Sequence, residues 1–329
     1  MNAPLSMTSI TSSLASDVKE AQRFILNQGD QTQLGILEKR NGWVSLGAIL
    51  MDWIIVGFSF GLAVGHPVFV LPALLVVGSR QRALSNLIHD ASHWSLFQDR
   101  STNDWIVNLL CAYPMFDTVG HYRKSHMSHH RYLGSEGDPD SNSHLRYGYN
   151  DGTPTSEKPL SLYLRLALNF NAIKDSIVGS IWQLPMRGRV SCVVWWAATL
   201  FILSLSFSVT LSLIFISFWM LSRATGYHLI RIFAEFLDHA GLQTGSVFGF
   251  TRNLPHRGII RFLFNPHGDT FHLVHHLMPS VPFHRLRNAD RVLSRMKRYE
   301  MAHHCDSYFF GPHSAILCWT GRCQEKAGP

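Results

Sequence analysis

The sequence predicts an all-α integral membrane protein, with four transmembrane helices in two hairpins and a cytoplasmic helical cap. Only 16% of its 329 residues are charged and 46% are hydrophobic, whereas about 25% of the residues of an average soluble domain are charged. The apolar residues are clustered into long stretches, and about 20 residues of helix cross the hydrocarbon core of a bilayer. Polar segments rich in histidine follow these stretches and supply the expected cap.

The first predicted span runs from about Trp43 to Val64, and Asp52 interrupts it. A carboxylate within a span is costly unless it faces protein or water. Two interpretations therefore stay open: the span starts near the interface at Asp52, or Asp52 faces the protein interior. The sequence Gly-His-Pro at residues 65–67 then predicts a tight turn.

The second predicted span starts at Val68 and continues past Arg80 and Arg82 toward His89. Arginines beside an apolar helix mark the cytoplasmic interface. We therefore expect this helix to rise out of the membrane and to carry His89 and His93 above its surface.

Three segments between the hairpins are too short or too polar to span. Residues 105–116 are apolar, but a stretch of about 12 residues is too short for a span and predicts an interfacial or re-entrant segment. Residues 134–158 are rich in Gly, Ser, Asp and Pro, which is typical of loops. Residues 160–184 mix apolar and charged side chains, which predicts helix lying along the interface.

The second hairpin lies between Arg189 and Arg223, where 33 residues include no Asp, Glu, Lys, Arg or His. As one helix they would extend about 50 Å, well beyond a hydrocarbon core of about 30 Å. Two helices joined near residues 206–208 fit better, with the second continuing toward His228. An even number of spans also keeps every histidine-rich segment on one side of the membrane.

The distribution of basic residues predicts which side that is. The turns at residues 65–67 and 206–208 carry no Lys or Arg, whereas the histidine-rich segments carry nearly all of them. By the positive-inside pattern, we expect a multi-pass protein with both termini and the histidine site in the cytoplasm. The same placement accounts for the net charge of +7. A nucleic-acid partner is not expected, because the chain has neither a recognised binding module nor a basic stripe.

These features divide the chain into three parts. Residues 1–42 form a polar N-terminal tail, in which the stretch around residues 16–26 has the pattern of an amphipathic helix. Residues 43–300 form the membrane domain, and residues 301–329 form a C-terminal tail.

Three histidine motifs follow the predicted spans: the pair His89 and His93, the triplet His126-x-x-His129-His130, and the triplet His272-x-x-His275-His276. On a helix, positions i, i+3 and i+4 lie on one face, so each triplet projects three imidazoles into one small volume. Neutral imidazoles are the commonest protein ligands of metals, and eight are too many for one ion. A cationic helix face that binds nothing is the alternative for any single motif, but it does not explain three.

The residue types also restrict the metal. Imidazoles without thiolates or a carboxylate-rich cage suit Fe(II) or Zn(II). Zinc has no redox chemistry, and a closed structural zinc site uses four ligands. The number of histidines therefore favours a reactive centre with more than one ion.

The three motifs resemble those of the membrane fatty acid desaturase and hydroxylase superfamily. The resemblance extends from about Trp53 to Leu293 and includes Tyr122-Arg123, Asp138-Pro139-Asp140 and Leu277-Met278-Pro279. It implies a fatty acid desaturase in which histidines hold two iron ions (Fe2+) that use O2 and two electrons to attack an unactivated C–H bond. It also implies an acyl-lipid, acyl-CoA or acyl-carrier substrate, and an external electron donor of the ferredoxin or cytochrome b5 type.

The resemblance further suggests a ninth ligand between the fourth span and the last motif, where the candidates are His228, His239, His256 and His267. His239 fits best, because it follows the fourth span by about two helical turns, as His89 and His93 follow the second.

Three further residues are candidates for supporting the ligands. Glu235 lies one turn before His239 on the same face, so it is placed to bind iron directly, through water, or as a hydrogen-bond acceptor. Alternatively, Glu235 forms an ion pair with Arg231 or Arg223 and takes no part in the metal site. Asp90 is a candidate acceptor for a ligating imidazole, and His267 is a candidate ligand or supporting residue.

Other functions stay open. A hydroxylase or ketolase of another lipid, or a desaturase of a small specialised metabolite, would begin with the same hydrogen abstraction. From a different class, a membrane metal transporter or metal-binding protein would also collect histidines. A transporter, however, places ionisable residues within its spans near the membrane midplane, and here the predicted spans are almost free of them.

Overall fold

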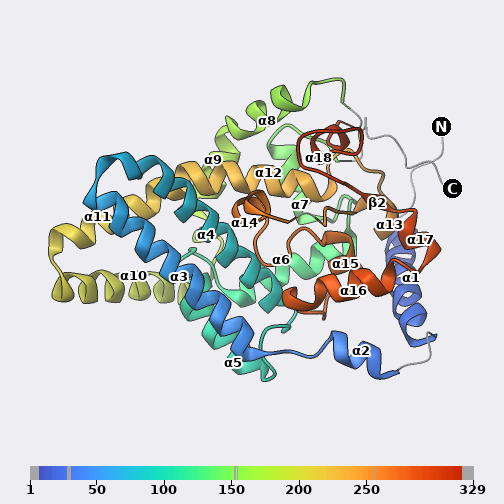
Figure 1. Ribbon diagram of the computed structural model, residues 1–329, viewed down its shortest axis with the longest axis horizontal. Coiled ribbons are helices and arrows are strands. Elements are labelled where there is room, and N and C mark those ends of the chain that lie inside the picture. Colours follow the sequence, from blue (N-terminus) through green and yellow to red (C-terminus); the bar gives the residue numbers. More distant parts are fainter. Residues whose placement is uncertain (1–6, 28–30, 152, 154, 256, 321–329) are drawn as a thin grey trace.

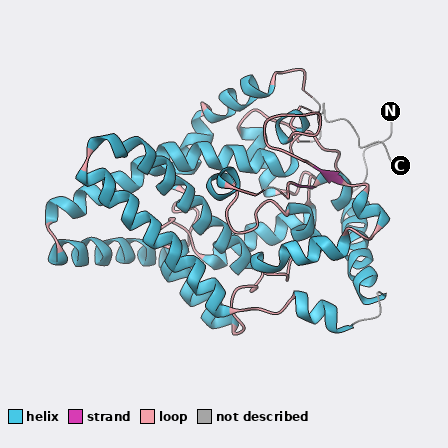
Figure 2. Cartoon of the chain, in the orientation of Figure 1, coloured by secondary structure: helices cyan, strands magenta, loops and turns pink. Residues whose placement is uncertain are grey.

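The computed structural model describes residues 7–27, 31–151, 153, 155–255 and 257–320, and it is mostly helical (Figure 2). The longer helices are α1 (Met7–Asn27), α3 (Gly42–Gly65), α4 (Val70–Ser92), α6 (Val119–Tyr132), α10 (Met186–Ser206), α11 (Val209–Ser222) and α12 (His228–His239). The shorter helices are α2 (Gln31–Leu37), α5 (Arg100–Val107), α7 (Pro139–Arg146), α8 (Pro159–Ala167), α9 (Phe170–Val178), α13 (Val247–Phe250), α14 (Ile259–Phe264), α15 (His272–Leu277), α16 (Leu286–Leu293), α17 (Lys297–Glu300) and α18 (Ala315–Cys318). Single turns of 3-10 or π helix are η1 (Pro67–Phe69), η2 (Asn108–Ala112), η3 (Arg223–Tyr227) and η4 (Phe283–Arg285), and β1 (Arg252–Asn253) pairs in parallel with β2 (His303–His304).

Four helical stretches are long and apolar enough to cross a membrane, which confirms the number predicted from the sequence. They are Thr32–Gly65, Pro67–Ser92, Met186–Ser206 and Val209–His239. Their breaks lie at the two predicted turns. At the first, the His66 ring accepts a hydrogen bond from the backbone N–H of Val68, and at the second the Ser208 hydroxyl caps α11 by accepting from Leu211.

Figure 1 shows the four long helices extending toward the left, where the turn between α3 and α4 and the turn between α10 and α11 form two tips. α3 lies against α4, α10 lies against α11, and α4 also contacts α11 and η3. The segments that carry the histidine motifs lie away from the tips, around the far end of α4.

Two glycines allow α4 and η3 to touch through their backbones. A Cβ atom added to Gly78 would lie 2.2 Å from the backbone nitrogen of Tyr227, and one added to Gly226 would lie 2.5 Å from the carbonyl oxygen of Leu74. Small residues permit such close helix contacts in membranes. The contact sets the position of α12, which continues from η3, relative to α4.

Asp52 faces the protein interior, so the structure decides between the two interpretations of the first span. The residue is 1% exposed. Its carboxylate lies 2.9 Å from Nη1 of Arg80 on α4 and 2.7 Å from Nε2 of His267. A buried carboxylate with two such partners is stabilised within a span.

Replacing Asp52 by alanine is expected to destabilise the protein strongly. Removing one partner of a buried ion pair costs about 3–5 kcal/mol, because the other charge remains buried and unpaired. The melting temperature of the protein purified in detergent measures the effect. Glu157→Ala is the matched control, since its pair with Arg165 is largely exposed and such pairs contribute about 0–1 kcal/mol. Equal melting temperatures for both variants would contradict the prediction.

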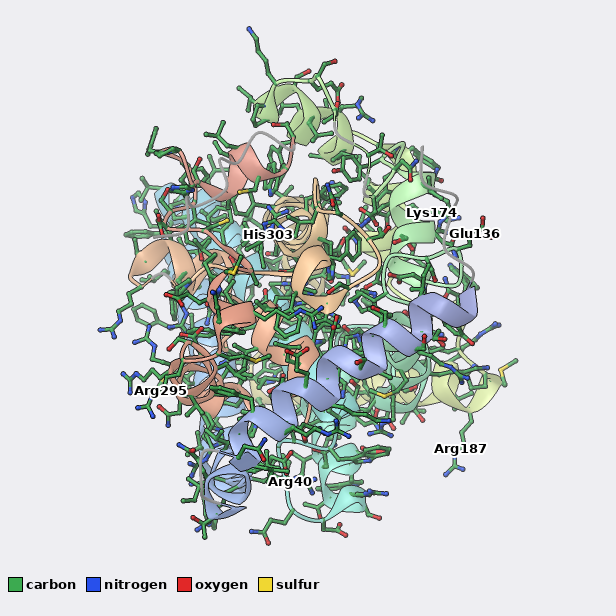
Figure 3. All side chains as sticks on the ribbon, turned by 90° about the vertical axis from the view of Figure 1, so that its right-hand side faces the viewer. Arg40, Glu136, Lys174, Arg187, Arg295 and His303 are labelled. Atoms are coloured by element: carbon green, nitrogen blue, oxygen red, sulfur yellow. The ribbon has the colours of Figure 1, made fainter. Side chains whose placement is uncertain are left out.

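Within the segment that the sequence predicts as a polar tail, residues 7–27 form α1 and residues 31–37 form α2. Leu14, Ala21 and Ile25 lie on one face of α1 and are buried against the core around Leu273 and Leu286. Figure 3 shows α1 crossing the face of the molecule opposite the two tips. The amphipathic pattern around residues 16–26 therefore marks a helix that packs on the domain.

The described part of the predicted C-terminal tail also packs on the domain. β2 pairs with β1, and the aromatic residues Tyr308 and Trp319 are buried beside Phe233 of α12.

The segment predicted as loop at residues 134–158 includes the helix α7, which Asp138 caps by accepting a hydrogen bond from Asp140 N–H.

Candidate metal centre

Nine histidines from four helices converge beyond the cytoplasmic ends predicted for the second and fourth spans. α4 supplies His89, and His93 directly follows the last residue of α4. The other seven come from α6, from the end of α12 and from α15: His126, His129, His130, His239, His272, His275 and His276. The structure therefore brings together all eight motif histidines and the predicted ninth, His239.

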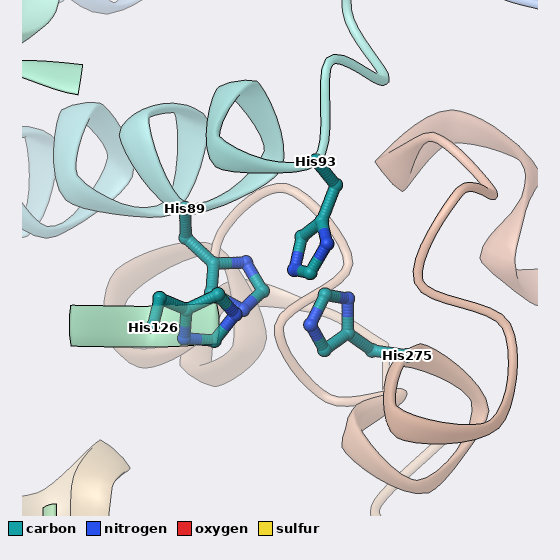
Figure 4. Close-up of side chains that lie close together, drawn as sticks. All are labelled: His89, His93, His126 and His275. Carbon is teal, nitrogen blue, oxygen red and sulfur yellow. The ribbon is translucent and has the colours of Figure 1, made fainter. Parts of the chain in front are cut away.

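The histidines form two groups. His89, His93, His126 and His275 have ligand atoms within 4.8 Å of one another (Figure 4), and so do His129, His239, His272 and His276. The ninth residue, His130, belongs to the first group by distance, because its Nε2 atom lies 3.0 Å from Nε2 of both His126 and His275. Its ring also stacks on His276, with centroids 4.3 Å apart, so it lies between the groups.

Within the second group the Nε2 atoms face one another. The Nε2 atom of His272 lies 2.8 Å from that of His239 and 2.9 Å from that of His276, and His129 lies 3.3 Å from His276. An imidazole Nε2 atom carries either one proton or one lone pair, so it does not satisfy two like neighbours at once. A cation bound by nitrogen at about 2.1 Å brings neighbouring ligand atoms to similar separations.

Two hydrogen bonds fix lone pairs toward this group. Nδ1 of His129 lies 2.8 Å from Oδ1 of Asp138, and Nδ1 of His239 lies 2.7 Å from the carbonyl oxygen of Phe250. Because both oxygens are acceptors, each Nδ1 is the protonated donor, and each ring in its neutral form turns an unprotonated Nε2 toward the centre. Asp138 is itself held by the backbone N–H groups of Gly134 and Asp140.

Burial keeps most of these imidazoles neutral. It lowers the pKa values of six of them well below the ordinary 6.5, and neighbouring histidines lower them further: His93, His126, His130, His272, His275 and His276. Metal ligation requires the neutral form.

His129 differs from the other ligands in its basicity. Burial opposes its charge, but the carboxylates of Asp138 and Asp140 raise the pKa of His129 to about 9. Burial also opposes the charge of Asp138, yet His129 and the backbone N–H groups lower the pKa of that carboxyl to about 2. The hydrogen-bonded carboxylate therefore makes His129 a basic imidazole, which strengthens it as a donor to a metal.

The residues present fit a pair of transition-metal ions. Nine imidazoles supply nitrogen donors of the kind that iron and zinc accept. Nε2 of His93 is buried and has no hydrogen-bond partner among the described residues, which an ion in the first group would remedy.

The proposed supporting residues lie in different places. Oδ1 of Asp90 lies 3.4 Å from Nδ1 of His89, and its other oxygen accepts a hydrogen bond from Phe283 N–H. Both carboxylate oxygens of Glu235 pair with Nη1 of Arg231, at 3.0 and 2.9 Å, which is the alternative that the sequence left open. His267 belongs to neither histidine group and pairs with Asp52 instead.

The loop before α15 is tied to α4, and these ties position the third motif. Nδ2 of Asn86 donates to the carbonyl oxygen of Pro266 at 2.9 Å, and Arg82 pairs with Asp269 at 2.9 Å. His267 adds the contact with Asp52 on α3. His267 therefore acts on the centre by holding this loop.

Two further positioning residues were not predicted as such from the sequence, although Arg123 belongs to the Tyr122-Arg123 pair that carries part of the resemblance. Asn253 of β1 caps α15, because its Oδ1 accepts hydrogen bonds from the N–H groups of Leu273 and Val274. Arg123 of α6 pairs with Asp104 and donates to the carbonyl oxygen of Ala91, which joins the second motif to the first. Both act across long stretches of sequence, so local patterns do not reveal them.

A cavity of about 300 Å3 opens beside the histidines. His89, His126, His129, His239 and His272 form one wall, and α4, η3, α12 and the segment from α7 to α9 form the rest. The cavity gives a small molecule access to both groups.

Comparisons with known proteins agree with this centre. The sequence model of the family described as fatty acid desaturase matches residues 65–309, which is more than half of the chain. The chain belongs to this family. The match confirms the resemblance seen in the three motifs.

The chain is also similar to dihydrorhizobitoxine desaturase from Bradyrhizobium elkanii, with 30% identity over 238 residues. That match covers 67% of this chain and 66% of the relative, so the chain spans just under two thirds of the relative's length.

Proposed function

We propose that this member of the fatty acid desaturase family is a membrane-bound, O2-dependent di-iron enzyme that introduces a carbon–carbon double bond. The observation that carries the proposal is the division of nine buried or partly buried imidazoles into two adjacent groups. Two ions placed side by side suit a reaction that consumes O2, and the donor set suits iron.

The five histidines around His93 would hold one Fe2+ ion and the four around His239 would hold the other. When bound, the two ions supply O2 activation and the oxidising power that removes hydrogen from an unactivated C–H bond. The chain's own residues prepare the site: Asp138 keeps the proton of His129 on Nδ1, and burial of most of the rings limits their contact with water.

The overall reaction needs an external source of electrons. A CH2–CH2 unit loses two hydrogen atoms and becomes CH=CH, O2 is reduced to two water molecules, and a donor supplies two electrons together with two protons. A donor of the ferredoxin or cytochrome b5 type fits this requirement, and the basic face of the protein favours docking of an acidic carrier.

The identity of the substrate separates the remaining alternatives. An acyl chain is the substrate class that the family resemblance implies, while a hydroxylase, a ketolase and a desaturase of a small specialised metabolite share the same chemistry. The name of the Bradyrhizobium relative supports desaturation. A metal transporter gains no support, because the histidines cluster at or beyond the ends of the candidate spans and Asp52 within the first span is paired with Arg80.

Iron content and O2 consumption test the proposed function. The protein, purified in lipid nanodiscs and loaded anaerobically with Fe2+, is expected to hold about two irons per chain by elemental analysis. With a reductant and substrate it is expected to consume O2, and chelation of the iron stops the reaction. One tightly bound zinc ion, or activity that survives removal of iron, would contradict the proposal.

The proposed topology places both termini and the metal centre in the cytoplasm. Figure 3 faces the end of the molecule opposite the two tips and shows Arg40, Arg187 and Arg295 extending outward, as the positive-inside pattern requires. A reporter fused after residue 329 is expected to read as cytoplasmic, and a reporter inserted at residues 206–208 as external. The reverse result for either reporter would rule out the four-span arrangement.

A further inference from the structure

The cavity beside the metal centre is lined by charged groups. Its walls include four arginines and six acidic residues, besides the histidines. Sites for apolar ligands are lined predominantly by hydrophobic and aromatic side chains, and their volumes extend from about 300 to 1,000 Å3. This cavity lies at the small end of that range and has the opposite chemistry.

A long acyl chain fits such a lining poorly. An acyl chain would displace water from the charged groups without forming hydrogen bonds to them in its place. Burial of polar groups without hydrogen-bond partners is unfavourable. A polar molecule replaces the displaced water with hydrogen bonds of its own.

Most of the charged groups in the lining already have partners. Arg82 pairs with Asp269, Arg146 with Asp175, and Arg231 with Glu235. The two charges within each pair offset each other. The three other carboxylates of the lining, those of Asp117, Asp140 and Asp238, each lie within 4 Å of a histidine.

Arg223 is the exception among these arginines. It lies on η3, is 1% exposed and lines the cavity. Its Nε donates to the carbonyl oxygen of Ile177 and its Nη1 to the sulfur of Met115, while its guanidinium lies over the rings of Phe116 and Tyr227. No described carboxylate forms an ion pair with it, and no described residue accepts a hydrogen bond from its Nη2.

The carboxylate of Asp117 acts on Arg223 electrostatically but forms no ion pair with it. A buried guanidinium without an ion pair is placed to bind an anionic group on the ligand. Arginine matches the planar carboxylate through paired, charge-assisted hydrogen bonds. The cavity also offers a neutral polar group beside the histidines: the ring of Tyr122 stacks on His126 with centroids 5.5 Å apart, and its hydroxyl has no hydrogen-bond partner among the described residues.

We infer that the substrate is a small, water-soluble molecule whose carboxylate pairs with Arg223. The inference rests on the proposed function, since it assigns the substrate of the same centre.

The first experiment identifies the chemical class of the substrate. Protein in nanodiscs, loaded with Fe2+ and supplied with O2 and reductant, is incubated separately with the water-soluble and the lipid-soluble fraction of the cells that express it. Mass spectrometry then detects molecules that lose two hydrogen atoms or gain one oxygen atom. We expect these products in the water-soluble fraction and expect the parent molecule to carry a carboxylate. Products only in the lipid-soluble fraction would overturn the inference and leave the proposed function intact, whereas no product in either would overturn both.

The second experiment tests Arg223 without turnover. Anaerobic binding of the identified acid and of its methyl ester is measured by thermal shift on the iron-loaded protein, on Arg223→Lys and on Arg223→Met. The wild-type protein is expected to bind the acid at least tenfold more tightly than the ester, Arg223→Lys to keep part of that preference, and Arg223→Met to lose it. Iron content separates this effect from general damage, and the exposed Arg187→Met variant is the matched control. An undiminished preference for the acid in an iron-replete Arg223→Met protein would overturn the assignment.

Discussion

Replacing His93 by alanine is expected to abolish turnover and to remove about one of the two iron ions, and replacing His276 is expected to do the same. The two residues belong to different histidine groups, so each change removes a ligand from one ion only. Loss of a residue that merely orients a ligand already lowers metal affinity by about 10–100-fold, and loss of the ligand itself has a larger effect. Elemental analysis of the purified variants, together with product formation, measures both outcomes.

The double variant gives the sharper result. His93→Ala with His276→Ala is expected to be almost free of iron, because both groups are then incomplete. His66→Ala serves as control, since His66 is exposed in the turn after α3, and it is expected to keep two irons. All variants are expected to insert into the membrane, because His93 and His276 lie outside the four candidate spans and the exposed His66 lies in the turn between two of them. Two irons and near-normal turnover in either single variant would refute a centre shared by all three motifs.

Local composition was sufficient to predict the helical framework. The Gly-His-Pro turn and the serine-rich turn at residues 206–208 end long apolar stretches, and helix breaks follow there because these residues cap or interrupt helices within the chain itself. The eight motif histidines could be grouped for the same reason, since their spacing places them on single helical faces near the ends of the apolar stretches. His239 belongs to no such motif and was predicted from the family resemblance.

The residues that hold the histidines in place could not be predicted in this way. Asp52 reaches His267, which is 215 positions away, and Asn253 caps a helix that begins about 20 positions later. Such partners depend on the packing of α3, α4 and α15 against one another. The polar lining of the cavity could not be predicted from the sequence either. In the sequence, Arg82 and Arg223 mark the edges of membrane helices, whereas in the fold both residues line the cavity beside the histidines.

Glu235 fits two sequence patterns that predict different partners for its carboxylate. Its spacing from His239 places both on one helical face, but Arg231 lies at the same spacing on its other side, and the ion pair forms within one turn of α12. Glu235→Gln is therefore expected to leave the iron content unchanged, and any effect on turnover would come through the lining of the cavity.

The assignment of His239 as the ninth ligand gives the last prediction. His239→Ala is expected to lower the iron content by about one ion per chain and to abolish turnover. Its Nε2 lies 2.8 Å from Nε2 of His272, and its Nδ1 donates to Phe250, so its lone pair is directed at the group. Of the other candidates, His256 lies outside the described residues, and His267 pairs with Asp52.

His228 supplies the matched control for this prediction. It lies on the same helix and is as deeply buried, at 3% exposure against 5% for His239. Its Nε2 donates to the carbonyl oxygen of Ala167 and its Nδ1 accepts from the Ser176 hydroxyl, so no lone pair remains for a metal. His228→Ala is expected to lower stability but to retain two irons. If His239→Ala retained two irons and near-normal turnover while His256→Ala lost them, the ninth ligand would be His256.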